Sequence, residues 1–229
     1  MAGANELRWV KAVLFDLDGT LLDSLPGIAF SAKAAFAQCG LAMGEAQLRG
    51  LIGPPIRVIL AQMAKAYETG GLSESELDAL EQAFRVSYDG EGWKMTPHYE
   101  GAAEVLRDMR ARGKRLFVVS NKPRHIALRI LDAEGTLGLF EEVVTRDSRE
   151  PAFKGKVEMM RYLLQKWEIT PDESLMVGDT IEDAQAAVEV GMQFCLMTHG
   201  YGDVPLGAGV PVAFRLGRFS ELMSGDSSE

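Results

Sequence analysis

The chain has 229 residues, of which 47% are hydrophobic, and a formal net charge of −9. Its acidic balance, without a Lys/Arg-rich block, argues against nucleic acid or an anionic membrane as a partner. No apolar run approaches the ~20 residues of a membrane-spanning helix, the start lacks a signal-peptide pattern, and two isolated cysteines suit a reducing compartment. We therefore expect a cytoplasmic protein.

Six short apolar runs predict buried parallel strands, because they are continuously hydrophobic rather than alternating. The expected strands are residues 12–15, 116–119, 142–145, 174–177, 194–197 and 212–214. Helical patterns lie between most of them, at residues 104–112, 124–134, 156–167 and 182–190. Repeated strand–helix–strand units predict an α/β fold built on a doubly wound parallel sheet.

Residues 22–93 interrupt that alternation, because their apolar spacing is helical throughout. Helices are expected at residues 28–38, 56–67 and 74–88, with Gly/Pro-rich segments between them. A helical block of this length between the first two strands predicts an inserted helical cap domain, with residues 1–21 and 94–229 forming the α/β core. The alternative is that the block covers one face of the sheet.

Two carboxylates follow the first predicted strand in Asp16-Leu-Asp18-Gly19-Thr20. At this spacing both side chains point toward the carboxyl edge of the sheet, where open α/β sheets bind ligands. Gly19 permits a sharp turn and brings backbone amides close to an anion. Two adjacent acids repel each other unless a cation is present, and hard divalent cations prefer oxygen ligands. An ordinary Asp/Gly turn is the competing interpretation.

Acids also follow the fourth predicted strand, in Gly178-Asp179-Thr180-Ile-Glu182-Asp183. From a neighbouring strand end, Asp179 can reach the same cation as Asp16. Asp183 lies one helical turn further on, so it either orients a ligand or a lysine, or complements the positive end of a helix dipole. Both interpretations of Asp183 fit the sequence.

The second strand ends in Ser120-Asn121-Lys122-Pro123, and a segment containing Lys154 and Lys156 precedes the fourth. A hydroxyl followed by free amides at a helix start can hold a phosphate oxygen, although Ser and Asn also form plain helix caps. Either lysine can neutralise phosphate and nucleophile as a compact point charge. At least one of the two must be an ordinary surface lysine.

The motifs together resemble the haloacid dehalogenase superfamily of phosphohydrolases, in its phosphoglycolate-phosphatase-like branch. The resemblance covers almost the whole chain. It rests on the run from Asp16 to Gly27, the segment from Gly101 through Asn121-Lys-Pro, Val177-Gly-Asp-Thr180, the helix from Ala184 to Gly191, and His199-Gly-Tyr-Gly202. It implies a Rossmann-like core in which the helical insert is a mobile cap.

The resemblance also implies roles for the acids. Asp16 is expected to be the nucleophile and a Mg²⁺ ligand, and Asp18 the general acid/base, touching the metal through its backbone carbonyl. Asp179 is expected to complete the metal ligands of the protein, with Asp183 supporting that set.

For the phosphate, the resemblance implies binding by Ser120, assisted by the backbone amides of Asp18 and Asn121. The sequence departs from the branch pattern at the lysine, where Lys-Pro-x-Pro is expected. Spacing to the fourth strand favours Lys154 on the phosphoglycolate-phosphatase template. The Lys-x-Glu pattern at a helix start favours Lys156 on the phosphoserine-phosphatase template, and Lys156 is our choice.

These residues predict a Mg²⁺-dependent phosphomonoester hydrolase that forms an aspartyl-phosphate on Asp16 and acts on a small phosphorylated metabolite, with a phosphoglycolate-like substrate favoured. The alternatives are a phosphomutase of the same superfamily and a non-catalytic phosphometabolite-binding protein. Substrate specificity is expected from the cap segment 51–57, in which Arg57 either meets a second anionic group of the substrate or is a solvated arginine.

Overall fold

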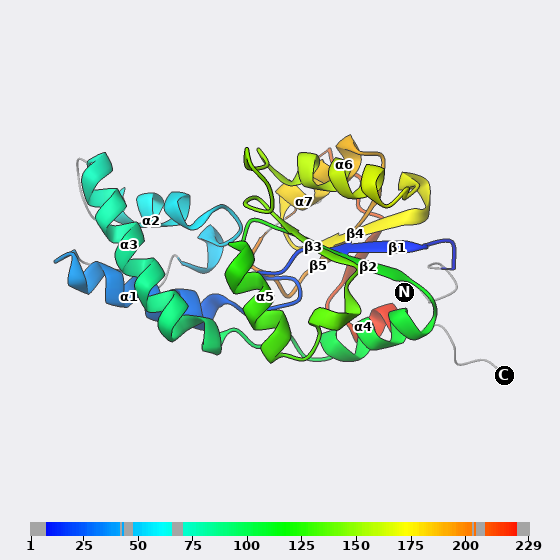
Figure 1. Ribbon diagram of the computed structural model, residues 1–229, viewed down its shortest axis with the longest axis horizontal. Coiled ribbons are helices and arrows are strands. Elements are labelled where there is room, and N and C mark those ends of the chain that lie inside the picture. The colour runs from blue at the N-terminus through cyan, green and yellow to red at the C-terminus, as the bar shows by residue number, and fades with distance from the viewer. Residues whose placement is uncertain are drawn as a thin grey trace.

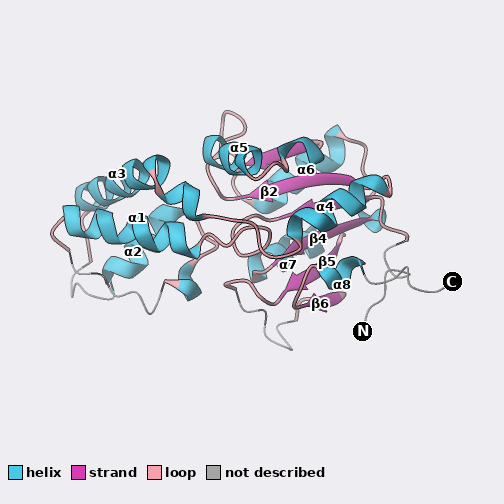
Figure 2. Ribbon diagram, turned by 90° about the horizontal axis from the view of Figure 1, so that it is seen from below, coloured by secondary structure: helices cyan, strands magenta, loops and turns pink. Residues whose placement is uncertain are grey.

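The computed structural model describes residues 8–41, 43, 48–65, 71–202, 204 and 209–223. Within them, a sheet of six parallel strands has the order β3-β2-β1-β4-β5-β6 (Figures 1 and 2). The strands are β1 (Ala12–Phe15), β2 (Arg115–Ser120), β3 (Glu142–Thr145), β4 (Ser174–Gly178), β5 (Gln193–Met197) and β6 (Phe214–Leu216). The predicted doubly wound sheet is confirmed. Only β6 is displaced from its predicted range, because pairing with β5 starts with Phe214 opposite Cys195.

Helices cover both faces of the sheet, as the continuously apolar strands require. Val13 and Phe15 of β1 belong to a core cluster shared with α4 (Ala102–Ala111), α5 (Arg124–Ala133) and α8 (Ser220–Met223). Ala12 and Leu14 point to the opposite face and pack with α6 (Lys156–Lys166) and α7 (Ile181–Glu189). The four core helices predicted from the sequence are present, with ends shifted by at most two residues.

The residues between β1 and β2 form a separate group of helices beside the sheet (Figures 1 and 2). They are α1 (Leu25–Gln38), the short η3 (Arg49–Leu51), α2 (Ile56–Lys65), α3 (Glu74–Gly90) and the short η4 (Gly92–Met95). We call this group the cap. Residues 66 and 67 of the second predicted helix lie outside the described residues. The cap does not lie over a face of the sheet, which was the alternative arrangement.

Local sequence explains how α3 begins and what it packs against. Ser73 accepts a hydrogen bond from the Glu76 amide, and the Glu76 carboxylate accepts one from the Ser73 amide, forming a capping box. Leu77, Leu80 and Phe84 recur at helical spacing and are buried, in the same apolar cluster as residues of α1. The cap thus has an apolar interior of its own, continuous with one core cluster.

Two adjacent linkers connect the cap to the core. The Asp23 amide donates to Pro97 O at 2.9 Å, and the Tyr99 amide donates to Leu21 O at 2.9 Å, so the outgoing and returning chains are paired. Where α1 meets η4, a Cβ at Gly27 would overlap the backbone of Gly92. The chain therefore enters and leaves the cap at one narrow place, next to the end of β1.

The strand order also fixes where a ligand can bind. From β1 the chain proceeds outward through β2 and β3, then crosses to β4 on the other side of β1 and proceeds outward again. Neighbouring connections diverge at that point, which leaves a crevice at the carboxyl ends of β1 and β4. The cap helices lie over this edge of the sheet (Figure 1).

Candidate active site

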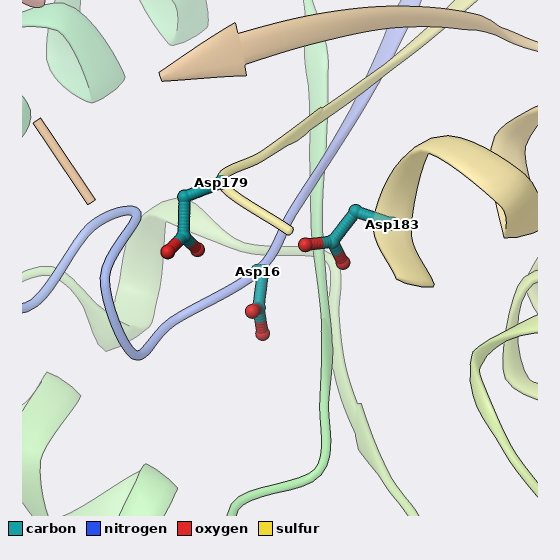
Figure 3. Close-up of side chains that lie close together, drawn as sticks. All are labelled: Asp16, Asp179 and Asp183. Atoms are coloured by element: carbon teal, nitrogen blue, oxygen red, sulfur yellow. The ribbon is translucent and has the colours of Figure 1, made fainter. Parts of the chain in front are cut away.

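Three buried carboxylates gather at the ends of β1 and β4 (Figure 3). Asp16 follows β1, Asp179 follows β4 and Asp183 stands in the first turn of α7. One oxygen from each lies within 4.8 Å of the others. The parallel register accounts for this, because Phe15 lies opposite Val177 and the acids follow these positions. The pairing of acids predicted from separate strand ends is therefore present.

Asp16 is 3% exposed, and its two carboxylate oxygens have different surroundings. Oδ2 lies 2.8 Å from Lys156 Nζ, whereas Oδ1 is buried and has no hydrogen-bond partner among the described residues. A buried carboxylate oxygen without a partner is costly, so it marks the place where a ligand or cation would complete the site. Burial raises the pKa of Asp16 to about 8, although nearby Lys156 opposes this shift.

Backbone and side-chain donors fix Asp179. Its Oδ1 accepts from the Thr20 hydroxyl at 2.9 Å, and its Oδ2 accepts from the amides of Tyr201 and Gly202 at 2.8 and 3.1 Å. A side chain at Gly200 would overlap Asp179, which explains the glycine there. Burial, followed by the charge of Asp183, raises the pKa of Asp179. The orienting role of this loop was not foreseen from the sequence.

Asp183 combines both roles that the sequence left open. Its Oδ2 accepts hydrogen bonds from the Thr180 amide and hydroxyl at 3.1 and 2.6 Å, forming the capping box of α7. Its Oδ1 lies 2.5 Å from Lys156 Nζ. The helix cap therefore aims one carboxylate oxygen at the lysine.

The structure brings Lys156, and not Lys154, to the acids. Lys156 is the first residue of α6 and is 2% exposed, with its ammonium between Asp16 and Asp183. These two carboxylates raise the pKa of Lys156 despite its burial. Lys154 lies in the preceding loop with an exposed side chain. Gly155, which separates them, is the N-cap residue of α6.

A divalent cation fits this donor set. Three carboxylates face one ammonium, which leaves an excess of negative charge in a buried space. All the donors are oxygen atoms, as Mg²⁺ prefers. Asp16 Oδ1 offers an unused lone pair, while donors already orient the Asp179 carboxylate. Asp16 and Asp179 are thus the residues that would hold the ion, with Asp183 positioning Lys156 beside it.

Ser120 and Asn121 follow β2 on the same edge. The Ser120 hydroxyl is buried and accepts from the Lys122 amide at 3.3 Å. The Asn121 side chain donates to Gly53 O of the cap at 3.2 Å and to Glu182 at 3.1 Å. The Asn121 side chain therefore holds the cap loop against the core, a contact that the sequence did not reveal.

Asp18 is held apart from the three acids. Its Oδ1 accepts hydrogen bonds from the Ser24 hydroxyl and from Lys122 Nζ, the latter at 2.7 Å. Lys122 is 5% exposed and also donates to the Tyr88 hydroxyl of the cap at 2.9 Å. The sequence analysis quoted Lys122 within its motif but gave it no role.

Between cap and core lies a cavity of about 60 Å³. Asp16, Asp18 and Ser120 form its polar floor, and apolar residues such as Ile52, Ile59 and Phe84 form the cap side. At about 10–15 Å³ for each water measured this way, it holds only a few water molecules.

Arg57, expected either to meet a second anionic group of the substrate or to be a solvated arginine, is not among the described residues that line this cavity. Its guanidinium is bound by Glu74, Asp78 and Glu81 of α3, at 2.6, 2.7 and 2.9 Å. Ile56 and Ile59 turn one side of α2 toward the cavity, and Arg57 points toward α3 instead. The arginine that lines the cavity is Arg85, which pairs with Glu81 at 2.5 Å.

Comparisons with known proteins agree with this geometry. A family model described as "Haloacid dehalogenase-like hydrolase" matches residues 13–197. The chain is 34% identical over 205 residues to the phosphoglycolate phosphatase of Nitrosospira multiformis, covering 85% of this chain and 86% of that protein. A crystal structure of a predicted phosphoglycolate phosphatase from Haemophilus somnus has a TM-score of 0.84 at 28% identity, covering 94% of this chain and 97% of that one.

The tyrosine-protein kinase PtkA of Mycobacterium tuberculosis is also similar, with 34% identity over 193 residues. That match covers 84% of this chain but only 63% of PtkA.

In the described residues, no helix is long and apolar enough to cross a membrane. The family model matches most of the chain, and acids from two strand ends meet at one site. The chain belongs to the haloacid dehalogenase-like hydrolase family.

Proposed function

We propose that the protein is a Mg²⁺-dependent phosphomonoester hydrolase that acts through an aspartyl-phosphate on Asp16. One observation carries the proposal: Asp16 lies beside a buried lysine, one of its oxygens is buried with no hydrogen-bond partner among the described residues, and oxygens of two further acids lie within 4.8 Å of one of its own. This arrangement suits a carboxylate that shares a cation with a phosphate group. The phosphatase relatives, which the chain matches over most of their length, support the same conclusion.

In the first step an Asp16 oxygen attacks phosphorus, and the bond between phosphorus and the ester oxygen breaks. Bound Mg²⁺ would reduce repulsion between the carboxylate and the phosphate and stabilise developing charge. The Lys156 ammonium, next to Asp16, adds positive charge at the same place. The Ser120 hydroxyl on the cavity floor holds a phosphate oxygen, and Asp18 gives a proton to the departing alkoxide.

In the second step a water molecule attacks phosphorus of the aspartyl-phosphate. Asp18, now without its proton, takes one from that water, and the Asp16 carboxylate is released with inorganic phosphate. The apolar cap side of the cavity excludes bulk water while the intermediate exists. The small cavity supports a small phosphorylated metabolite as the substrate, with phosphoglycolate-like compounds favoured and a cytoplasmic location expected.

The test is phosphate release from a panel of phosphorylated metabolites with and without Mg²⁺, including phosphoglycolate, sugar phosphates and an aryl phosphate. We expect release that depends on Mg²⁺ and is lost in Asp16→Asn. Rapid quenching with labelled substrate should trap a hydroxylamine-sensitive phosphoprotein, absent from that variant. No release from any compound, or unchanged release by Asp16→Asn, would contradict the proposal.

Phosphoryl transfer to a protein tyrosine is a second candidate function, favoured by the similarity to PtkA over 84% of this chain. Incubation with γ-labelled ATP and a tyrosine-containing protein tests this candidate, because a protein-tyrosine kinase leaves label on tyrosine whereas a phosphomonoester hydrolase leaves none there. A phosphomutase would instead return the phosphoryl group to a second position of the same metabolite. A non-catalytic binding protein would retain ligand affinity in Asp16→Asn without turnover.

A further inference from the structure

Lys122 is a buried lysine outside the cluster formed by the three acids and Lys156. It follows Ser120 on the core, is 5% exposed, and its ammonium contacts two groups that come from different parts of the molecule. One is Asp18 Oδ1 at 2.7 Å, in the core, and the other is the Tyr88 hydroxyl at 2.9 Å, in α3 of the cap. A lysine is rarely buried without a specific partner, so these two contacts account for its position.

The contact with Asp18 restricts the orientation of that carboxylate. Oδ1 receives hydrogen bonds from both Ser24, the N-cap residue of α1, and Lys122, which follows β2 in the core. Two donors on one oxygen restrain the rotation of the carboxylate, and Asp18 is one of the residues that line the cavity. The pair therefore positions Asp18 for proton transfer.

The contact with Tyr88 depends on where the cap lies. Tyr88 is 5% exposed, stacks on Phe84 with ring centroids 5.4 Å apart, and has its hydroxyl 3.1 Å from that of Thr96 near the linker. Its ring is thus fixed within the cap, and its hydroxyl reaches Lys122 only when α3 approaches the core. A second tie, between Asn121 and Gly53 O, forms in the same arrangement.

We propose that Lys122 is a positioning residue that holds Asp18 in its proton-transfer orientation and is itself held by Tyr88 when the cap lies against the core. The inference rests on the proposed hydrolase function. It adds the contacts through which the position of the cap affects the orientation of Asp18. Misplacement of a reacting group by about 1 Å can reduce a rate about 100-fold, so even a small movement of Asp18 has a measurable effect.

The test compares two substrates in the same enzyme: an alkyl phosphate, whose departing oxygen needs a proton, and p-nitrophenyl phosphate, whose departing oxygen hardly does. Loss of proton transfer slows the first substrate selectively. For Lys122→Met we expect kcat on the alkyl phosphate to fall about 100-fold, against less than about fivefold on the aryl phosphate. Tyr88→Phe, which keeps the stacked ring, should give the same selectivity at about tenfold.

Two further variants keep the test decisive. Lys94→Met removes an exposed lysine beside the linker, paired with Glu91 on the surface, and should leave both rates unchanged. In an Asp18→Asn background, Lys122→Met should cause no additional loss on the alkyl phosphate, because it acts through Asp18. If Lys122→Met does not fold, Tyr88→Phe alone decides the outcome.

Equal losses on both substrates would overturn the inference, since they indicate a general structural role. A rise in KM with kcat unchanged would also overturn it, because it would mean that Lys122 binds substrate directly. Wild-type hydrolysis of both compounds shows that the proposed function holds whatever the variants do. If the wild type hydrolyses neither, it is the proposed function that fails.

Discussion

Replacing Lys156 by methionine removes the ammonium that separates Asp16 from Asp183 while keeping a side chain of similar length. The lysine makes ion pairs at 2.8 and 2.5 Å. At an effective dielectric constant of about 20, each is worth roughly 6 kcal/mol before desolvation. Desolvation of the buried ions cancels much of this, and breaking such pairs costs about 3–5 kcal/mol in practice. For a chain of this size that lowers Tm by roughly 6–20 °C.

The assay is thermal unfolding of metal-free Lys156→Met and wild type, above and well below pH 8, the value to which the pKa of Asp16 is raised. The stability loss should be larger above that pH, because Asp16 of the wild type is then ionised and stabilised by Lys156, whereas the variant lacks the lysine that favours the ionised form. Mg²⁺ should restore part of the stability, since it supplies positive charge at the same acids. We also expect kcat to fall by about 100- to 1,000-fold, as when one transition-state donor is removed.

Lys154→Met is the matched control, because Lys154 is the exposed lysine that the sequence could not distinguish from Lys156. It should change stability by less than about 0.5 kcal/mol and leave kcat within about twofold. If instead Lys154→Met inactivates the enzyme and Lys156→Met does not, the assignment of the phosphate-neutralising lysine is wrong. An unchanged Tm in Lys156→Met would refute the reasoning about the buried pair.

Four other outcomes are expected. Mg²⁺ affinity should rise with pH up to about 8, because the raised pKa of Asp16 keeps this residue protonated below that pH when no metal is bound. Mg²⁺ binding should therefore release a proton, which calorimetry in two buffers measures. Because folded Asp16 holds its proton more tightly than the unfolded chain does, the free energy of unfolding of the metal-free protein should fall as pH rises from 3.8 to about 8. Gly200→Ala should weaken Mg²⁺ binding about 10- to 100-fold, by displacing Asp179, in a metal titration. Arg57→Ala should leave KM within about twofold, whereas Arg85→Ala, inside the cavity, should raise it about tenfold.

The sequence was sufficient to predict the sheet and the acids at its edge, because these depend on local patterns. Most core strands contain a short apolar run, and parallel pairing places every carboxyl end on one edge. Asp16 and Asp179 therefore converge without knowledge of loop conformations. Residue spacing alone did not decide between Lys154 and Lys156. The structure separates them because α6 begins after Gly155, so that only Lys156 is turned toward the acids.

What the sequence missed lies between cap and core. Ile59, Leu60 and Met63 recur at helical spacing and are buried, so this spacing indicates the inward side of α2. Arg57 does not share that side. The sequence contains no such signal for Tyr88 and Lys122, because their contact depends on how the cap packs against the core. Helical periodicity indicates which side of an element is buried but not which residue it meets.

The distribution of charge explains why these missed contacts matter to the chemistry. Lys156 lies with the acids that would share a cation, whereas Lys122 lies with Asp18 and touches the cap. Both lysines have raised pKa values, because their carboxylate partners outweigh their burial, so each remains a cation. Of these two lysines, only Lys122 has a described contact with the cap, through Tyr88. In the proposed mechanism, movement of the cap would break this contact and so alter the group that transfers the proton, which ties turnover to an enclosed substrate.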